Sequence, residues 1–134
     1  MMRWILASLC LFAAGLCNGV MDSLQFHFSQ TMFADAARFD PQFWNPAESW
    51  KNKYLDYDAS KGEAFFGSST FLVFTTDAWH LLKFFMLKFF VLAALCFAFG
   101  PRWYWDELAD WVKVAIGMIG LTLCYQIGFW VSYV

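Results

Sequence analysis

The hydrophobic pattern of this chain consists of long apolar stretches separated by polar connections, and two of the stretches are long enough to cross a membrane. Residues 4–21 contain no charged side chain over 18 positions, and residues 114–134 contain none over 21. A transmembrane helix needs about 20 predominantly apolar residues. We therefore expect spans at about residues 3–24 and 112–133.

The middle apolar stretch is shorter, because residues 89–101 are free of charge over only 13 positions. A span of sufficient length must begin near residue 80 and include Lys83 and Lys88, whose long side chains can carry their ammonium groups to the headgroup region. We expect this second span at about residues 80–99.

The helix that contains the second span is expected to begin before the membrane. The segment Gly67–Thr70 has the sequence GSST, which interrupts a helix and supplies capping side chains. A helix from Thr70 to Phe99 would be about 45 Å long, so about three of its turns would project beyond a hydrocarbon core of about 30 Å. Asp77 would then lie in the headgroup region and His80 at its inner edge.

These patterns predict an all-α protein with a single membrane domain over residues 1–134, a three-helix bundle of transmembrane helices with a short interfacial helix in the loop between the first and the second. Composition supports this class, because only 15% of the residues are charged, against about a quarter in soluble domains. Arg3 followed by an apolar stretch is typical of a signal sequence. Since that stretch continues to Met21, we expect an uncleaved signal-anchor.

The loop over residues 28–68 is aromatic throughout, which argues against a disordered linker. Within it, Asn45 is placed to cap a short helix that has Pro46 at its first position and Glu48 in its first turn. The helix would carry three aromatic side chains on one face: Trp50, Tyr54 and Tyr57. Such a helix either lies at the membrane interface or packs on the protruding ends of the spans, and the sequence leaves both arrangements open.

Polar side chains are expected to gather at one membrane surface, because the end of the first span and the start of the second face the same side. Ionisable groups are costly at membrane depth, so those that occur there often mark a functional site. The candidates are Asn18, Asp22, Gln25, His27, Lys53, Asp77, His80 and Lys83.

Three kinds of chemistry fit this set. Asp77 and His80 at i, i+3 could bind a metal together with His27. Alternatively, Asp77 orients His80 as a general base, with Asp22 and Lys53 as further catalytic candidates. In the third arrangement, His27 and His80 are the axial ligands of a haem. The spacing of these residues does not identify a cofactor, and it does not decide whether the protein is an enzyme.

The structural alternative needs no ligand. A carboxylate near hydrocarbon requires a partner, so Asp77 would pair with a cation, for which Lys53 and Lys83 are the candidates. In this interpretation His80 is an interfacial residue and the cluster stabilises the bundle.

Small residues recur at helical spacing in the third span and allow another helix to approach closely. They are Gly117, Gly120, Cys124 and Gly128. We expect them to pack within the bundle, with self-association as the alternative.

Three stretches, MDSLQFH at residues 21–27, SWKNKY at 49–54 and TDAWH at 76–80, resemble a family of small integral membrane proteins of bacteria and phages. The resemblance covers roughly residues 18–85. The family has no established activity, so the resemblance gives membership without a mechanism; it implies that the three stretches act together. We expect a location in the bacterial inner membrane.

Basic residues predict the orientation, since Arg3, Arg102 and Lys113 would all lie on the cytoplasmic side if the amino terminus is inside. The net charge of −2 without a basic cluster excludes nucleic acid as an expected partner. We expect membrane lipids as partners, with other membrane-protein subunits as further candidates. The function expected is that of a binding or accessory component of a membrane assembly; the alternative is a compact membrane enzyme that acts on a lipid headgroup.

Overall fold

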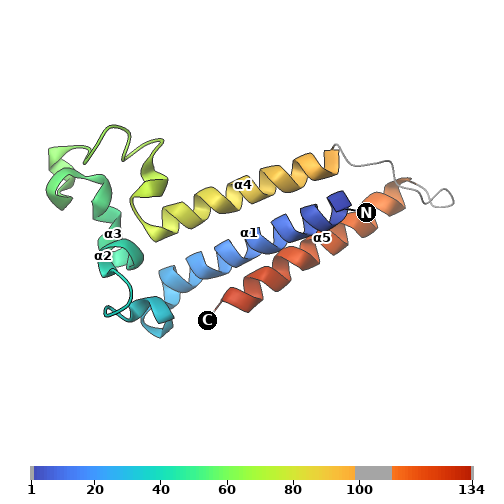
Figure 1. The fold of residues 1–134 in the computed structure, drawn as a ribbon, viewed down its shortest axis with the longest axis horizontal. Coiled ribbons are helices and arrows are strands. Elements are labelled where there is room, and N and C mark those ends of the chain that lie inside the picture. The colour runs from blue at the N-terminus through green and yellow to red at the C-terminus, as the bar shows by residue number, and fades with distance from the viewer. Residues whose placement is uncertain (1, 99–109, 134) are drawn as a thin grey trace.

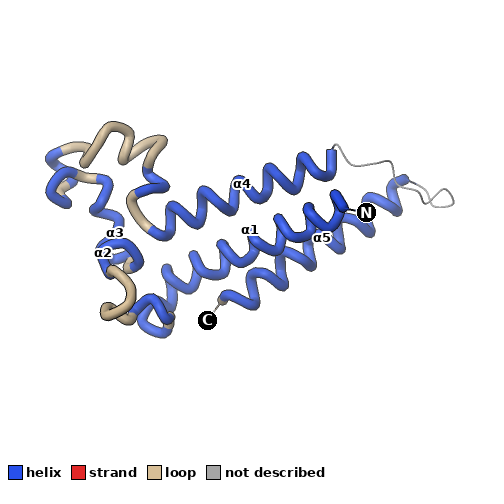
Figure 2. Tube along the Cα trace, viewed as in Figure 1, coloured by secondary structure: helices blue, strands red, loops and turns tan. Residues whose placement is uncertain are grey.

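The computed structural model describes residues 2–98 and 110–133, and its long elements are all helices (Figures 1 and 2). They are α1 (Met2–His27), α4 (Ala78–Ala98) and α5 (Asp110–Ser132). Each contains a window long and apolar enough to cross a membrane. The all-α, three-span architecture expected from the sequence is confirmed, and the protein is an integral membrane protein.

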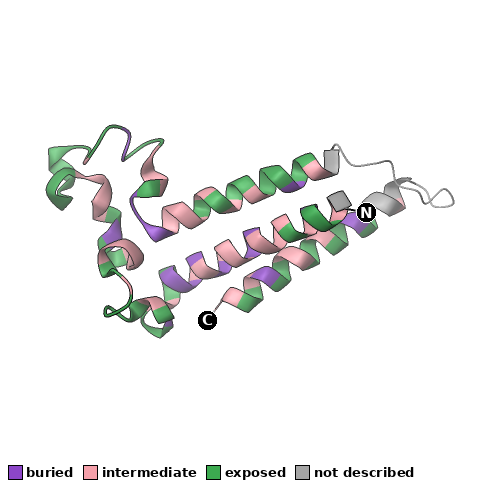
Figure 3. Ribbon diagram, viewed as in Figure 1, coloured by how far each residue is buried: buried purple, intermediate pink, exposed green. Residues whose placement is uncertain are grey.

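Helix α1 lies between the other two long helices and packs against both (Figure 1). The buried positions are concentrated on α1, whereas most described residues of α4 and α5 are exposed or partly exposed (Figure 3). The buried apolar side chains are small or flexible: Ala7, Ala14, Met21, Leu24, Ala78 and Ala93. The core is therefore formed mainly where α1 packs against its two neighbours. The outward faces of α4 and α5 are left to contact the bilayer.

Glycines bring the main chains of α1 and α5 into close contact. A Cβ atom added to Gly15 would collide with main-chain atoms of Tyr125 and Phe129. In the same way, a Cβ atom added to Gly128 would collide with the main-chain carbonyl of Phe12. Side chains larger than hydrogen are excluded at both positions, as in other membrane helix pairs that associate through small residues.

The four small residues expected to pack in the third span do not act alike. Gly128 lies against α1, Gly117 is buried and Cys124 is partly buried. Gly120 is exposed, and a Cβ atom there would meet nothing within 4 Å. The complementary glycines of α1 include Gly15, which belongs to a GxxxG pattern that the sequence analysis missed.

Polar side chains extend the α1–α5 interface toward the end of the bundle where the loop lies. The Ser132 hydroxyl lies 3.0 Å from the carbonyl oxygen of Leu16, and the buried Ser23 hydroxyl lies 3.3 Å from the carbonyl oxygen of Ser132. His27 Nε2 and the Tyr133 hydroxyl are 2.9 Å apart. These polar groups provide hydrogen-bond partners for one another at the end of the apolar α1–α5 interface.

The connection between α1 and α4 folds into short helices at one end of the bundle (Figure 1). Two are α-helical, α2 (Pro41–Trp44) and α3 (Pro46–Ser49). The others are 3-10 helices: Phe28–Gln30, Met32–Ala34, Trp50–Lys53, Leu55–Tyr57, Ala59–Lys61 and Val73–Thr75.

The start of α3 agrees with the capping prediction. The Asn45 side chain accepts a hydrogen bond from the Ala47 amide at 3.1 Å, and Pro46 occupies the first turn. The aromatic face predicted after it is only partly formed. Trp50 and Tyr54 are in ring contact at 6.2 Å, but Tyr57 has a positive φ of 62° and is exposed, so it leaves that face.

The expected start of the second long helix was wrong. The helix begins at Ala78, not at Thr70, and residues 70–77 form turns and the 3-10 helix Val73–Thr75. The reason is local, because Asp77 caps α4 by accepting a hydrogen bond from the His80 amide. The expected helix end at Phe99 and the charge of Arg102 lie outside the described residues.

Candidate juxtamembrane site

Asp77 stands at the first turn of α4 and is 2% exposed. One carboxylate oxygen, Oδ1, accepts a hydrogen bond from the main-chain amide of His80 at 2.8 Å. This is the geometry of an N-cap, in which a side-chain acceptor satisfies an amide that the helix itself leaves unpaired. Capping therefore fixes the position of the carboxylate.

The second carboxylate oxygen binds the imidazole of His80. Asp77 Oδ2 and His80 Nδ1 are 2.7 Å apart. A carboxylate can only accept, so Nδ1 is the donor, and a neutral His80 carries its acceptor at Nε2. The Thr76 hydroxyl is 3.2 Å from the same carboxylate oxygen. One side chain thus caps the helix and orients the ring.

The expectation that a lysine pairs with Asp77 was wrong. The Lys83 ammonium lies over the Trp79 ring at 4.9 Å, and the Lys53 ammonium lies over the Tyr54 ring at 5.5 Å. The carboxylate instead has the imidazole of His80 as its hydrogen-bond partner. Short-range contacts at the helix terminus satisfy Asp77 without a long side chain having to reach it.

Asn52 connects the loop to the start of α4. Its side-chain amide nitrogen lies 2.7 Å from the carbonyl oxygen of Thr76 and 2.7 Å from that of Gln42, while its oxygen accepts from Gln42 Nε2 at 2.6 Å. The hydrogen-bonding groups of this amide are all used. Asn52 therefore fixes the residue that precedes Asp77, a role that the sequence analysis did not predict.

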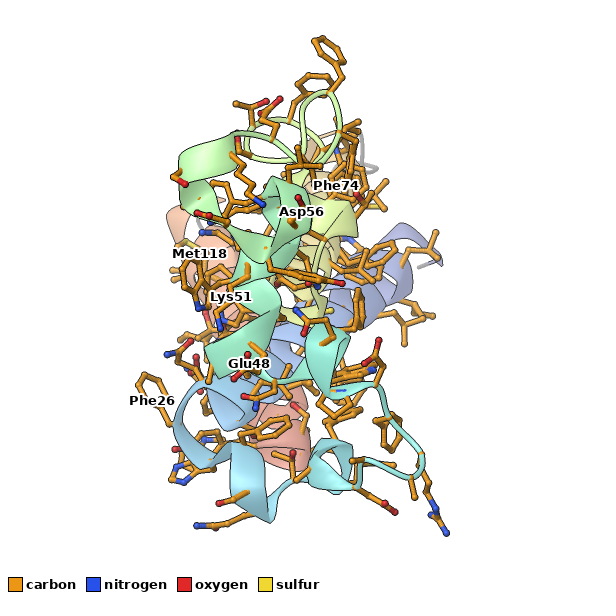
Figure 4. The ribbon with its side chains drawn as sticks, turned by 90° about the vertical axis from the view of Figure 1, so that its left-hand side faces the viewer. Phe26, Glu48, Lys51, Asp56, Phe74 and Met118 are labelled. Atoms are coloured by element: carbon orange, nitrogen blue, oxygen red, sulfur yellow. The ribbon has the colours of Figure 1, made fainter. Side chains whose placement is uncertain are left out.

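The Asp77–His80 pair lines a half-open cavity of about 230 Å³. Three separate segments form its walls: the end of α1, the α3 region and the start of α4. The lining residues are Gln25, Pro46, Ser49, Trp50, Asp77, Trp79 and His80. Figure 4 views the molecule from this end, where Glu48 and Lys51 form an exposed ion pair with a separation of 3.1 Å. Three of the eight candidates, Gln25, Asp77 and His80, thus line one cavity although they are far apart in the sequence.

Five of the eight candidate residues do not line this cavity: Asn18, Asp22, His27, Lys53 and Lys83. His27 hydrogen-bonds to Tyr133 on the α5 side of α1. Within residues 2–98 and 110–133, no three His, Cys, Asp or Glu side chains are grouped closely enough to hold a metal ion. The metal-binding set predicted from the sequence, His27, Asp77 and His80, is therefore not brought together. His27 lies at the end of α1, and its ring points toward α5.

The cavity combines aromatic walls with one oriented imidazole. Trp50 and Trp79 provide apolar surface, and each has a lysine ammonium near its ring. His80 Nε2 can accept a hydrogen bond from a ligand or take up a proton. The arrangement suits binding of an apolar group that carries a hydrogen-bond donor, and it also contains the elements of a general base.

Comparisons of the chain with protein-family models, with curated proteins and with solved structures found no match.

Proposed function

We propose that this protein is a small polytopic protein of the bacterial inner membrane whose juxtamembrane cavity binds a partner, as an accessory component of a membrane assembly. The observation that carries the proposal is the Asp77–His80 pair, which aligns an imidazole at a cavity built from three segments of the chain. A site that only stabilised the bundle would not need an open, aromatic-walled space.

The lining supports a binding role. Binding pockets are usually apolar, with a few polar groups that fix the orientation of the ligand. Here Pro46, Trp50 and Trp79 are the apolar walls. Among the polar lining residues, His80 uses Nδ1 for Asp77, which leaves Nε2 as the acceptor for a ligand. The partner that fits best is a segment that presents an apolar side chain beside an N–H or O–H donor.

The proposed orientation places the amino terminus in the cytoplasm, with α1 as an uncleaved signal-anchor. Arg3 and Lys113 support it, since both lie beside spans on the side opposite the loop. The cavity then opens on the outer surface of the inner membrane. Labelling of an introduced Ser60→Cys thiol by an impermeant reagent in intact spheroplasts is expected, and labelling only after lysis contradicts this orientation.

Photocrosslinking tests the binding role. A benzophenone amino acid at Trp50, which lines the cavity and is partly exposed, is expected to give a discrete adduct in native membranes. The adduct should disappear in His80→Ala. His27→Ala is the matched control, because this second histidine lies outside the cavity. An adduct that persists in His80→Ala, or no adduct at all, contradicts the proposal.

The same pair favours one second candidate function, that of a membrane enzyme acting on a lipid headgroup. Here His80 Nε2 would take a proton from a hydroxyl group or water, while Asp77 stabilises the resulting imidazolium. Removing such a base typically lowers the rate by about 10²–10⁴-fold. Lipid mass spectrometry of cells with His80→Ala should then show substrate accumulation; an unchanged lipid profile eliminates this candidate.

A further inference from the structure

A charge-free aromatic segment directly precedes α4. Residues 64–76 contain no charged side chain, and four phenylalanines lie among them: Phe65, Phe66, Phe71 and Phe74. The flanking carboxylates of Glu63 and Asp77 are both engaged in internal hydrogen bonds. We call residues 64–76 the aromatic arm.

The arm exposes its rings instead of burying them. Phe66 is 83% exposed and Phe71 is 61% exposed, and the two rings contact each other at a centroid distance of 5.6 Å. Phe65 is also exposed. Contiguous apolar surface of this kind usually marks contact with a membrane or with another protein.

A ring stack connects the arm to the first turns of α4. The Phe74 ring stacks on the Phe84 ring at 4.3 Å, with an interplanar angle of 18°. Phe84 belongs to the span Ala78–Cys96 and lies about 9 Å along the axis from the start of α4. The end of the arm therefore contacts α4 within its first two turns.

Internal hydrogen bonds hold the conformation of the arm. Glu63 accepts hydrogen bonds from the amides of Gly67 at 2.9 Å and Ser69 at 3.2 Å, and also from the Ser69 hydroxyl. The buried Ser68 hydroxyl donates to the carbonyl oxygen of Lys53 at 2.7 Å. Gly67 has a φ of 82°, a conformation that favours glycine. The phenylalanines are thus presented in fixed positions.

We propose that the aromatic arm inserts into the boundary between lipid headgroups and acyl chains beside α4, with Phe66 and Phe71 as its lipid contacts. The helix that follows the arm, α4, also exposes apolar side chains near its start, among them Phe85 and Leu87. Lipid is the occupant that fits, because the arm offers no charge to a protein partner and lies at the depth where aromatic rings are enriched.

Site-directed spin labelling of the full chain in nanodiscs of phosphatidylethanolamine and phosphatidylglycerol tests this placement. The background replaces Cys10, Cys17, Cys96 and Cys124 by Ser or Ala. Single labels follow at Phe66→Cys and Phe71→Cys, with Leu87→Cys as the membrane reference and Ser60→Cys as the aqueous reference.

The expected result is high accessibility to oxygen and low accessibility to a water-soluble nickel complex at both arm positions, as at Leu87. Nickel accessibility equal to that at Ser60 overturns the proposal, and so does protection from both reagents, which indicates a protein contact. A benzophenone amino acid at position 66 in the unmodified chain gives an independent measurement. Adducts of lipid mass support insertion, whereas adducts to protein contradict it.

Discussion

His27, the last residue of α1, and Tyr133, just beyond α5, are hydrogen-bonded at 2.9 Å, although 106 positions separate them in the chain. Their rings also meet edge to face, with centroids 5.5 Å apart. The contact fastens the carboxyl end of α5 to α1 at the end of the bundle that holds the candidate site. It also explains why His27 is not available to that site.

Replacing Tyr133 by Phe removes the hydroxyl and keeps the ring. We expect a loss of about 1 kcal/mol in the free energy of unfolding, the usual net value of a hydrogen bond. Reversible unfolding in detergent micelles measures it. Tyr57→Phe is the matched control, because the Tyr57 side chain is exposed. Equal stability of the two variants would show that the His27 contact contributes nothing.

Gly15→Ala should force α1 and α5 apart, because its Cβ atom would collide with the main chain of Tyr125 and Phe129. Overpacking of this kind typically costs about 1–3 kcal/mol. Gly120→Ala introduces the same methyl group where nothing lies within 4 Å, so we expect a neutral or slightly stabilising effect. Thermal unfolding of both variants is measured in the same detergent. A loss of stability in Gly15→Ala alone supports close approach of the two helices at Gly15, whereas an equal loss in both variants indicates that α1 and α5 tolerate alanine poorly in general.

Asp77→Ala and Asp77→Asn separate the two roles of this carboxylate. Alanine removes the cap, which typically costs about 1 kcal/mol. Asparagine keeps an oxygen for the His80 amide, so the stability loss should be smaller, but it disrupts the contact with His80 Nδ1.

Thermal unfolding and ¹⁵N spectra of the imidazole measure the two effects in the Asp77 variants. The ring nitrogen signals of His80 should change in both. An unchanged tautomer in Asp77→Asn would argue against the orienting role.

The arm should loosen in acid because of Glu63. The hydrogen bond from the Ser69 hydroxyl, followed by that from the Gly67 amide, lowers the pKa of Glu63 below its ordinary value of 4.5. A carboxylate whose pKa is lowered on folding stabilises the fold above the unfolded value, and the effect is lost as the pH falls through the lowered value. Amide exchange at Gly67 and Ser69, corrected for intrinsic rates, should therefore accelerate below pH 4.5.

Two substitutions check this assignment. Glu63→Gln should show fast exchange at the Gly67 amide at every pH. Asp58→Asn is the control, because the pKa of Asp58 is also lowered, first by the Ser60 hydroxyl and then by the Ser60 amide, but its contacts do not involve the arm. Equal acid sensitivity of Gly67 exchange in wild type and Glu63→Gln would contradict the role of Glu63.

The site was only partly predictable from the sequence. The spacing of Asp77 and His80 on one helix indicated that they could interact, since i, i+3 positions are neighbours on a helix. The predicted lysine partner was wrong. Lys83 is six positions from Asp77 and Lys53 is 24 positions away, and only the three-dimensional backbone geometry decides which group reaches the carboxylate. Asn52 carried no signal for its role, since its contact with Thr76 spans 24 positions.

The sequence by itself determined the all-α class, the three spans and the cap at Asn45. These features depend on the length of apolar runs and on contacts within a few residues, which any folded form of the chain would keep. The tertiary structure alone decided that α1 is the central helix, that Gly15 meets α5 and that Phe74 stacks on Phe84. Helix rotation, main-chain approach and the path of a loop depend on contacts between distant segments, and local sequence patterns do not specify them.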